Sequence, residues 1–479
     1  MDTVKKRFKE NNFVFIGIVC YFIALLLIAI FKDGTCDSGD SITHFLFSKY
    51  AFEHPENFLD HWAKPLFVLL SSPFAQFGFT GIKVFNCCIA ALTVWLTYKT
   101  ALILNYKNAW LAAIFLCFTP GYFIHIFSGL TEPLFALVVI LGIYLSLSGR
   151  LWIAACTISF LPFIRSEGLI IIGVFAFYLI YTKQYKYLPI LLTGHLIYSF
   201  VGAFYYHDLF WVFTKIPYAN SSGKYGSGTL SHFFIQLNYI IGVPLYILLG
   251  CGVVKKIIEL VSGKAPEHLT LKGSETLLLY AVFFAFFTAH IVFWYFGIFE
   301  SMGLKRVLIC ITPLAILIAL KGFNFIADFF YFNANRYRVM AGLLTGMVII
   351  FPFVPNPAAV DWQRDLSPSA DQNLIKQAAK YIEGDFPGNT FIYYTHPFIS
   401  LEMDRDPFNK QNNSELKDWT IKKKSGHYLI LWDNWFSVHE EGITLEQLKS
   451  DATLKLLKTF QVTDKGREIQ VAVFENQTN

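Results

Sequence analysis

Apolar runs long enough to cross a lipid bilayer follow one another through the first three-quarters of the sequence. A spanning helix needs about 20 mostly apolar residues. Inside hydrocarbon every backbone amide and carbonyl must be bonded within the protein, which favours helices. Charged residues make up only 15% of the chain, against about 25% in soluble proteins. We therefore predict a polytopic α-helical membrane protein.

The number of spans follows from the length of these runs. We predict about eleven transmembrane helices. The first is retained, because its run is too long for the apolar core of a signal peptide and no small-residue cleavage site follows it. Several runs are short, and we expect the fifth and sixth to be tilted or broken at the Arg165–Gly168 corner. The predicted spans are residues 12–31, 80–98, 109–126, 130–148, 151–164, 167–182, 187–206, 236–254, 275–297, 304–321 and 338–354.

Lys and Arg in the short loops predict the orientation, because these residues favour the cytoplasmic side. With a cytoplasmic N-terminus, the cytoplasmic segments hold roughly twice as many of them as the outer segments. An odd number of spans then places the C-terminus outside, whereas one miscounted span would reverse it. We expect a multi-pass protein of the inner (plasma) membrane with its C-terminal domain on the outer face.

The composition changes after residue 354, where several prolines mark a hinge. Residues 1–354 are predicted to form the transmembrane domain and residues 355–479 a small extracytoplasmic α/β domain. Within the latter, 369–384 suits an amphipathic helix. Segments rich in β-branched and aromatic residues suit strands, at 390–394, 427–432, 454–462 and 469–475.

Several function classes lack support in the sequence. The net charge of +5 is mild and the basic residues are scattered, so no nucleic-acid partner is expected. Seven of the eight cysteines lie inside apolar runs and no zinc-type spacing occurs, which predicts neither a disulfide framework nor a zinc site. There is no P-loop and no dinucleotide-binding fingerprint.

With this orientation the unusual polar residues gather at the outer face. Charges near hydrocarbon are costly and usually functional, so these segments are candidates for a site. They are the first outer loop with Asp33, Asp37, Asp40, Glu53, Glu56 and Asp60; the 126–132 corner with Ser128, Thr131 and Glu132; the 165–168 corner with Arg165, Ser166 and Glu167; the glycine-rich loop 207–235; and 300–306 with Glu300, Lys305 and Arg306.

Structural explanations compete with a role in a site. Thr131 can cap the helix that follows, and Glu132 can interact with its dipole. Arg165 and Glu167 can simply pair at a helix break. Anchoring at the membrane interface is the alternative for His61, Trp62, Lys305 and Arg306.

Four short motifs carry a resemblance to a known family. They are Asp60-His61-Trp62-Ala63-Lys64-Pro65, a Ser-x-x-Thr-Glu-Pro corner at 128–133, Arg-Ser-Glu-Gly at 165–168, and Lys305-Arg306-Val-Leu followed by Pro313. Their order resembles the GT-C superfamily of integral-membrane glycosyltransferases. Among these the sequence is most similar to bacterial relatives of protein O-mannosyltransferases and of the lipid A aminoarabinose transferase. The resemblance covers nearly all of residues 1–354.

The resemblance implies a catalytic base in the first outer loop. The family motif reads Asp-Glu followed by aromatics, and Asp40-Ser41-Ile42-Thr43-His44-Phe45 occupies its place. Ser41 replaces the Glu, so Asp37 is the candidate for the second carboxylate. Asp40 can equally be an N-cap of the helix that begins there, in which case Asp37 or Asp60 is the base.

The implied reaction is an inverting transfer of a mannose-like sugar from a polyprenyl-phosphate donor to an acceptor hydroxyl on the outer face. The leaving lipid phosphate needs cations, for which Arg306, Lys305 and Arg165 are the candidates. Candidates for holding the sugar or acceptor are Asp60, His61, Lys64, Glu132, Glu167, Tyr218 and Tyr225.

The expected partners are the lipid-linked donor, a glycan, lipid or protein acceptor, and membrane lipids. No cofactor is implied, although Asp33, Asp37 and Asp40 have the oxygen ligands that suit Mg²⁺. A transporter or lipid flippase is the alternative, and it predicts broken helices with charges near the midplane. A non-catalytic anchor for the C-terminal domain is a third possibility.

Overall fold

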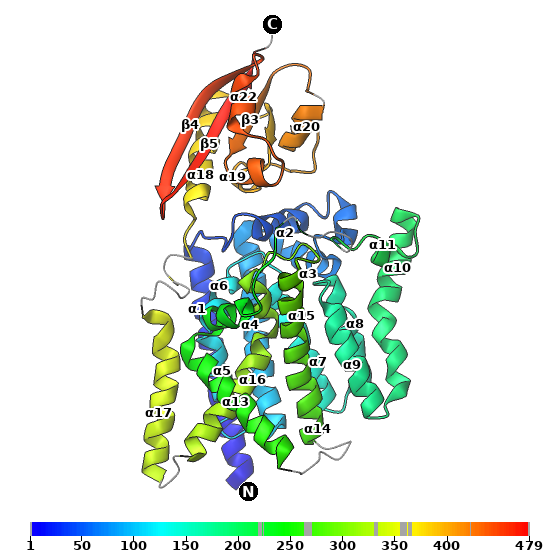
Figure 1. Cartoon of the computed structure of the whole chain (residues 1–479), viewed down its shortest axis with the longest axis vertical. Coiled ribbons are helices and arrows are strands. Elements are labelled where there is room, and N and C mark those ends of the chain that lie inside the picture. Colours follow the sequence, from blue (N-terminus) through cyan, green and yellow to red (C-terminus); the bar gives the residue numbers. More distant parts are fainter. Residues whose placement is uncertain are drawn as a thin grey trace.

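A computed structural model of the chain describes residues 2–218, 223, 225–262, 271–329, 334–354, 362, 366–421 and 423–477. Long helices up to residue 354 form a bundle, and a small sheet domain stands on one end of it (Figure 1). The N-terminus lies at the opposite end of the bundle. We call the end beside the sheet domain the sheet end.

The bundle is built from helices of very different length. Its elements are α1 (Asp2–Phe31), α2 (Asp40–Lys49), η1 (Pro55–Leu59), α3 (Pro65–Ala75), α4 (Gly78–Ile103), α5 (Leu111–Cys117), α6 (Pro120–Ile126), α7 (Glu132–Leu147), α8 (Leu151–Ser159), η2 (Leu161–Phe163), α9 (Gly168–Tyr181), η3 (Tyr185–Leu192), α10 (Thr193–Tyr206), α11 (Trp211–Thr214), α12 (His232–Ile241), α13 (Val243–Val261), α14 (Leu271–Glu275), the π-helix η4 (Thr276–Ala281), α15 (Val282–Phe296), η5 (Lys305–Ile311), α16 (Thr312–Phe329), α17 (Ala334–Ile350) and η6 (Phe351–Phe353).

Six helices among the described residues are long and apolar enough to cross a membrane, or seven if one bent pair counts as a single span. Four shorter apolar helices accompany them. All the predicted runs fall on helices, but two predicted spans are interrupted. The run 109–126 is split between α5 and α6, because Pro120 starts a new helix. The run 236–254 bends by 118° between α12 and α13, where Gly242 has a φ of +82°.

The expected break between the fifth and sixth runs is present, since η2 ends at Phe163 and α9 begins at Gly168. The apolar helix α3 was not among the predicted spans. It is only 11 residues long, which is short for a full crossing.

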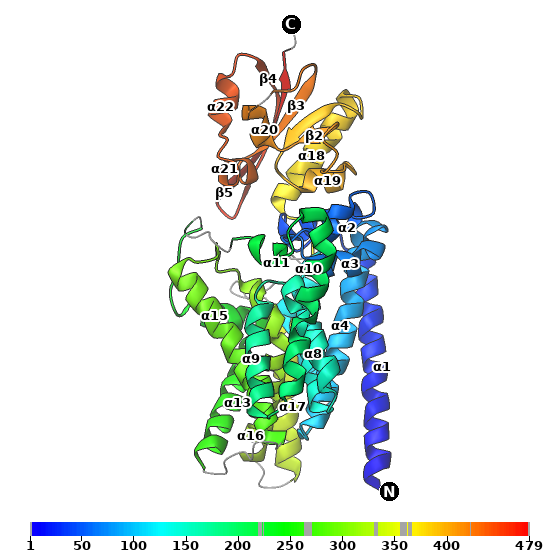
Figure 2. The ribbon, with the colours of Figure 1, turned by 90° about the vertical axis from the view of Figure 1, so that its right-hand side faces the viewer.

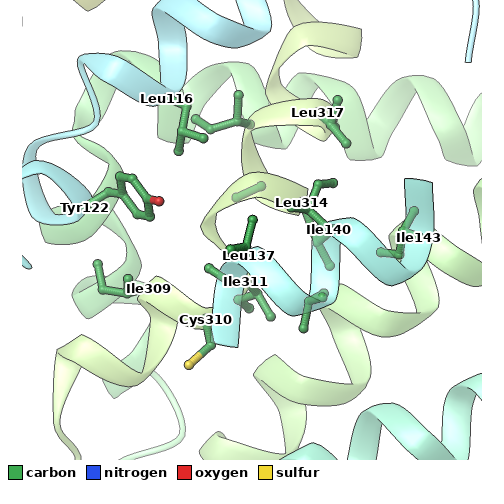
Figure 3. Close-up of a cluster of buried hydrophobic side chains, with 14 of the residues drawn as sticks. Leu116, Tyr122, Leu137, Ile140, Ile143, Ile309, Cys310, Ile311, Leu314 and Leu317 are labelled. Atoms are coloured by element: carbon green, nitrogen blue, oxygen red, sulfur yellow. The ribbon is translucent and has the colours of Figure 1, made fainter. Parts of the chain in front are cut away.

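The segment formed by η5 and α16 is the most enclosed of these candidate spans. Of its most apolar 18-residue stretch, 94% is buried. Figure 3 shows Cys310, Ile311 and Leu314 from this segment among Leu137 and Ile140 of α7. Buried aliphatic side chains of this kind contribute about 1.5–3 kcal/mol each in water; within a bilayer, close packing takes over that role. Because α7 and η5 both begin at the sheet end, this packing fixes the relative positions of Glu132 and Arg306.

The sheet domain confirms the predicted α/β fold. Its sheet has the strand order β2-β1-β3-β5-β4, with β1 parallel to β2 and β3, and β5 antiparallel to β3 and β4. The predicted helix and the four predicted strands are all present, and the two-residue β2 is an addition. The elements are α18 (Ala370–Asp385), β1 (Phe391–Tyr394), α19 (Phe398–Glu402), β2 (Asn413–Ser414), α20 (Leu416–Ile421), β3 (Tyr428–Asp433), α21 (Phe436–His439), α22 (Leu445–Ser450), β4 (Leu454–Asp464) and β5 (Arg467–Asn476).

The sheet domain and the bundle share an apolar core around α2. Ile42 and Phe45 of α2 belong to the same buried cluster as Leu374 and Ile375 of α18. In Figure 2, α18 and α19 lie on the α2 side of the sheet domain. The predicted boundary at residues 354 and 355 stays a prediction, because residues 355–361 lie outside the described part of the chain.

Candidate active site at the sheet end

The turn that leads into α2 places two carboxylates side by side. Asp40 is the first residue of α2, after the N-cap Gly39. The side chain that caps this turn is that of Asp37, whose Oδ1 accepts the amides of Gly39 and Ser41 at 3.0 Å each. Asp40 is therefore not the N-cap, and its carboxylate is available for other contacts.

Arg306, at the start of η5, binds both carboxylates. Its Nη1 donates to Asp37 and its Nη2 to Asp40. Its Nε lies 3.3 Å from Oε1 of Glu132. The side chain of Arg306 is 15% exposed and that of Asp40 is 44% exposed. Asp40 is thus the most open member of this group.

A second arginine approaches Glu132 from the other side. Nη1 of Arg165 lies 2.8 Å from Oε1 of Glu132, and its Nη2 donates to Glu167 at 2.8 Å. Glu132 is the first residue of α7 and is 0% exposed. Thr131 precedes it without a side-chain capping bond, and its hydroxyl accepts instead from Arg165 at 3.3 Å. The pairing of Arg165 with Glu167 is therefore part of a larger network, which joins the two corners.

Some residues of the Asp60–Pro65 motif stabilise its own loop, and one of them reaches the candidate site. Oδ1 of Asp60 accepts the amide of Ala63 at 2.7 Å, and Nε2 of His61 lies 3.0 Å from the carbonyl of Val212. Both side chains therefore shape the loop. Lys64 reaches the 165–168 corner, where its Nζ donates to Ser166 at 3.2 Å. Burial lowers the pKa of Lys64 to about 8.

An aromatic group borders the carboxylates. The Trp62 ring stacks on that of His44 with centroids 4.9 Å apart. The indole Nε1 of Trp62 donates to the hydroxyl of Tyr218 at 3.1 Å. Flat apolar rings with polar edges suit the face of a sugar ring, so Trp62 joins Tyr218 as a candidate contact.

Two other predicted residues lie apart from this network. The hydroxyl of Tyr225 donates to Glu440 of the sheet domain at 3.3 Å. Lys305 is exposed and has no ion pair within the described ranges. Tyr225 belongs to the predicted mobile loop 207–235, of which residues 219–222 and 224 lie outside the described residues.

The environments of the two aspartates push their pKa values apart. Burial, together with the neighbouring Asp40, raises the pKa of Asp37 above its usual value in spite of Arg306. Burial acts on Asp40 in the same direction, but Arg306 and His44 outweigh it and hold its pKa below the usual value. Burial also lowers the pKa of His44 to about 4. Asp40 is thus ionised over a wide pH range, and His44 is neutral near pH 7.

The position after Asp40 has no room for a second acid. Ser41 is 0% exposed, and its hydroxyl donates to the carbonyl of Thr35 at 2.6 Å while accepting the amide of Gly129 at 2.7 Å. A Cβ on Gly129 would lie 2.1 Å from the Ser41 carbonyl oxygen. This packing explains the departure from Asp-Glu, and it leaves Asp37 as the second carboxylate beside Asp40.

Buried histidines near the network were not predicted. Nε2 of His290, on α15, lies 3.9 Å from Glu167, and Nδ1 of His125, on α6, lies 2.6 Å from the Gly121 carbonyl oxygen. A single histidine within an apolar run carries no local signal of its partners. Only the presence of an ionisable group inside a span could have drawn attention to them.

The predicted metal ligands do not form a common group. Among the described residues, one set of side chains has ligand atoms within 4.8 Å of one another, namely Glu53, His54 and Asp406. Asp37 and Asp40 are both paired with Arg306. A divalent cation at Asp33, Asp37 and Asp40 stays an untested prediction.

Comparisons with known proteins agree with this architecture. No protein-family model and no curated protein sequence matches the chain. Two solved structures of ArnT from Cupriavidus metallidurans, one bound to undecaprenyl phosphate and one in the apo state, match with a TM-score of 0.57. Each match covers 95% of this chain and 98% of the other, at 11% and 12% sequence identity. The chain therefore has the fold of these two ArnT structures.

Proposed function

We propose that the protein is an inverting glycosyltransferase. It moves a sugar, mannose-like by the resemblance, from a polyprenyl-phosphate donor to an acceptor hydroxyl on the outer face of the membrane. The observation that carries the proposal is the network in which Arg306 and Arg165 converge on the buried Glu132 beside a half-buried Asp40. The ArnT fold, seen with undecaprenyl phosphate bound, supports the choice of a polyprenyl-phosphate donor.

The network has the groups that such a transfer needs. The donor keeps its polyprenyl tail in the bilayer and its phosphate and sugar at the sheet end. Arg306 presents a planar fork of N–H groups that matches phosphate oxygens, and Arg165 adds charge behind it. Glu132 is paired with both guanidiniums and fixes their positions relative to each other.

The chemical step is a single displacement. The acceptor oxygen attacks the anomeric carbon while Asp40 takes the hydroxyl proton. The bond from the anomeric carbon to the phosphate oxygen breaks, and its electron pair stays on the phosphate. The growing negative charge is stabilised by Arg306 and Arg165. Asp40 suits the role of base because it is ionised and is the most exposed carboxylate of the network.

The experiment uses the full chain in lipid nanodiscs with a radiolabelled polyprenyl-phosphate sugar and an acceptor glycan. Labelled acceptor and free polyprenyl phosphate should appear together, whereas a nucleotide sugar should give neither. Movement of intact donor across the bilayer of a proteoliposome, without bond cleavage, would instead indicate the flippase. We propose a cytoplasmic N-terminus and an outer sheet domain; active alkaline phosphatase fused after residue 479 would support this orientation.

A further inference from the structure

Gln372 of the sheet domain is buried at the junction with the bundle. It is the third residue of α18, whose N-cap is Ser369, and it is 2% exposed. Its Oε1 accepts the backbone amide of Ser369 at 3.2 Å, which completes a capping box. Capping uses only the carbonyl half of the side-chain amide, so its two N–H groups are free to donate elsewhere.

These N–H groups cross to the turn that precedes α2. Nε2 of Gln372 donates to the hydroxyl of Thr35 at 2.7 Å and that of Ser38 at 3.2 Å, and it lies 3.4 Å from the carbonyl oxygen of Asp37. The Thr35 hydroxyl in turn donates to the same Asp37 carbonyl at 2.7 Å. One side chain of the sheet domain therefore holds both ends of the segment from Thr35 to Ser38.

This segment carries the carboxylates of the candidate active site. Asp37 holds the amides of Gly39 and Ser41 through one oxygen and Arg306 through the other. The same turn is held from the bundle side by Ser41, which bonds Gly129. The position of Asp40 is thus set from the bundle by Arg306 and Gly129 and from the sheet domain by Gln372.

A second capping box in the same domain separates capping from this contact. Gln447 of α22 completes a box with Thr444, accepting its amide at 2.7 Å. The side chain of Gln447 is exposed, and its Nε2 makes no further hydrogen bond within the described parts of the chain. A capping glutamine therefore needs neither burial nor a distant partner, and the contacts of Gln372 are additional to its local role.

We propose that Gln372 is a positioning residue, through which the sheet domain fixes the turn from Thr35 to Ser41 and thereby the carboxylates of Asp37 and Asp40. For its effect on turnover, this inference rests on the proposed function. Gln372 touches no reacting atom; it acts through Thr35 and Asp37. The sheet domain is then a working part of the active site.

The test compares Gln372→Glu with Gln447→Glu in the full chain. Glutamate keeps the oxygen that a capping box needs, but an ionised carboxylate donates no hydrogen bond. We expect Gln372→Glu to speed hydrogen–deuterium exchange in the peptide containing residues 35–41, because the turn loses its donor. Its kcat should fall by up to about 100-fold, since a displacement of about 1 Å has that effect. Its KM for the lipid donor should change little, and Gln447→Glu should match the wild type in both readouts.

A second pair of variants tests the relay without a new charge. Thr35→Val keeps the shape of a residue that is 2% exposed but removes its hydroxyl, whereas Thr35→Ser restores the hydroxyl. We expect Val to speed exchange in the same peptide and lower kcat, and Ser to rescue both. Thermal unfolding is measured for every variant, so that a loss of folded protein is recognised.

The outcomes separate this inference from the proposed function. Unchanged exchange at residues 35–41 in both Gln372→Glu and Thr35→Val would overturn the positioning role, whether or not the protein is a glycosyltransferase. Faster exchange with wild-type kcat in an active enzyme would overturn the link to turnover. Faster exchange in the two variants, with no transfer by the wild type from any lipid donor, would support positioning and refute the proposed function.

Discussion

Arg306 pairs with Asp40 although 266 residues separate them in the sequence. The pair joins the beginning of the most buried span to the beginning of the helix beside the sheet domain. Asp37 occupies another N–H group of the same guanidinium, so one arginine organises two carboxylates with different pKa shifts.

Asp40→Asn should abolish most of the transfer while leaving the fold intact. Asparagine preserves the size of the side chain but cannot accept the proton, and loss of a general base lowers the rate by roughly 10²–10⁴-fold. Turnover is measured with radiolabelled donor in nanodiscs. Asp33→Asn is the matched control, because Asp33 is an exposed aspartate seven positions earlier in the same loop. Near-normal turnover in Asp40→Asn would transfer the role of base to another carboxylate.

Arg306→Ala should raise KM for the lipid donor and lower kcat by about 10²–10³-fold, the loss that follows removal of one charge-stabilising group. Both parameters change because phosphate charge is present in the ground state and grows in the transition state. Lys305→Ala removes the adjacent charge, which is exposed and outside the network, and should have little effect. Wild-type kinetics in both variants would argue for interface anchoring at both positions.

Gly129→Ala should disrupt the contact between the 126–132 corner and α2. The added methyl group would lie 2.1 Å from the Ser41 carbonyl oxygen, and such overpacking costs about 1–3 kcal/mol. The unfolding temperature and kcat are both expected to fall. Gly17→Ala in α1 is the control, because its methyl group meets nothing within 4 Å. An unfolding temperature equal to that of the control would mean that the corner adapts without cost.

The acidic limb of the kcat profile should reflect Asp37. Its pKa is raised above the ordinary 3.8, whereas that of Asp40 is lowered. As the pH falls, Asp37 therefore gains its proton first, and the pairing with Arg306 weakens while Asp40 is still ionised. In Asp37→Asn this limb should move to lower pH, because of the two aspartates paired with Arg306 only Asp40, with its lowered pKa, is left to titrate. An acidic limb at the same pH in both proteins would assign it to a different group.

Sequence patterns predicted the local elements well. The strand segment 427–432 is found as β3 and the helix segment 369–384 as α18, because the residue types of the former and the helical periodicity of the latter are local properties. The bend at Gly242 was missed although Pro244 follows two residues later, because the prediction used hydropathy alone, which joins the two helices into one run. The break near Arg165 was predicted because charged residues interrupt the apolar run there.

The site could be predicted only as a set of residues. Asp40 and Arg306 were both named, yet their pairing depends on how α2 and η5 are placed relative to each other in the bundle, which no local pattern encodes. Lys305 is the reverse case, since it adjoins Arg306 in sequence but is exposed and has no ion pair among the described residues. Gln372 was not singled out from the sequence, and only the structure shows which groups its N–H groups contact.

The apolar cluster common to α2 and α18 has a consequence for how these parts can be exchanged. A boundary drawn from composition at residue 354 separates a mostly apolar segment from a more polar one. The packing does not follow this boundary, because α2 shares its apolar cluster with α18. Removing the sheet domain would take away part of the apolar cluster in which Ile42 and Phe45 are buried. The domain is therefore not a portable module. A chimera that grafts a foreign tail onto this bundle would have to replace α2 along with it.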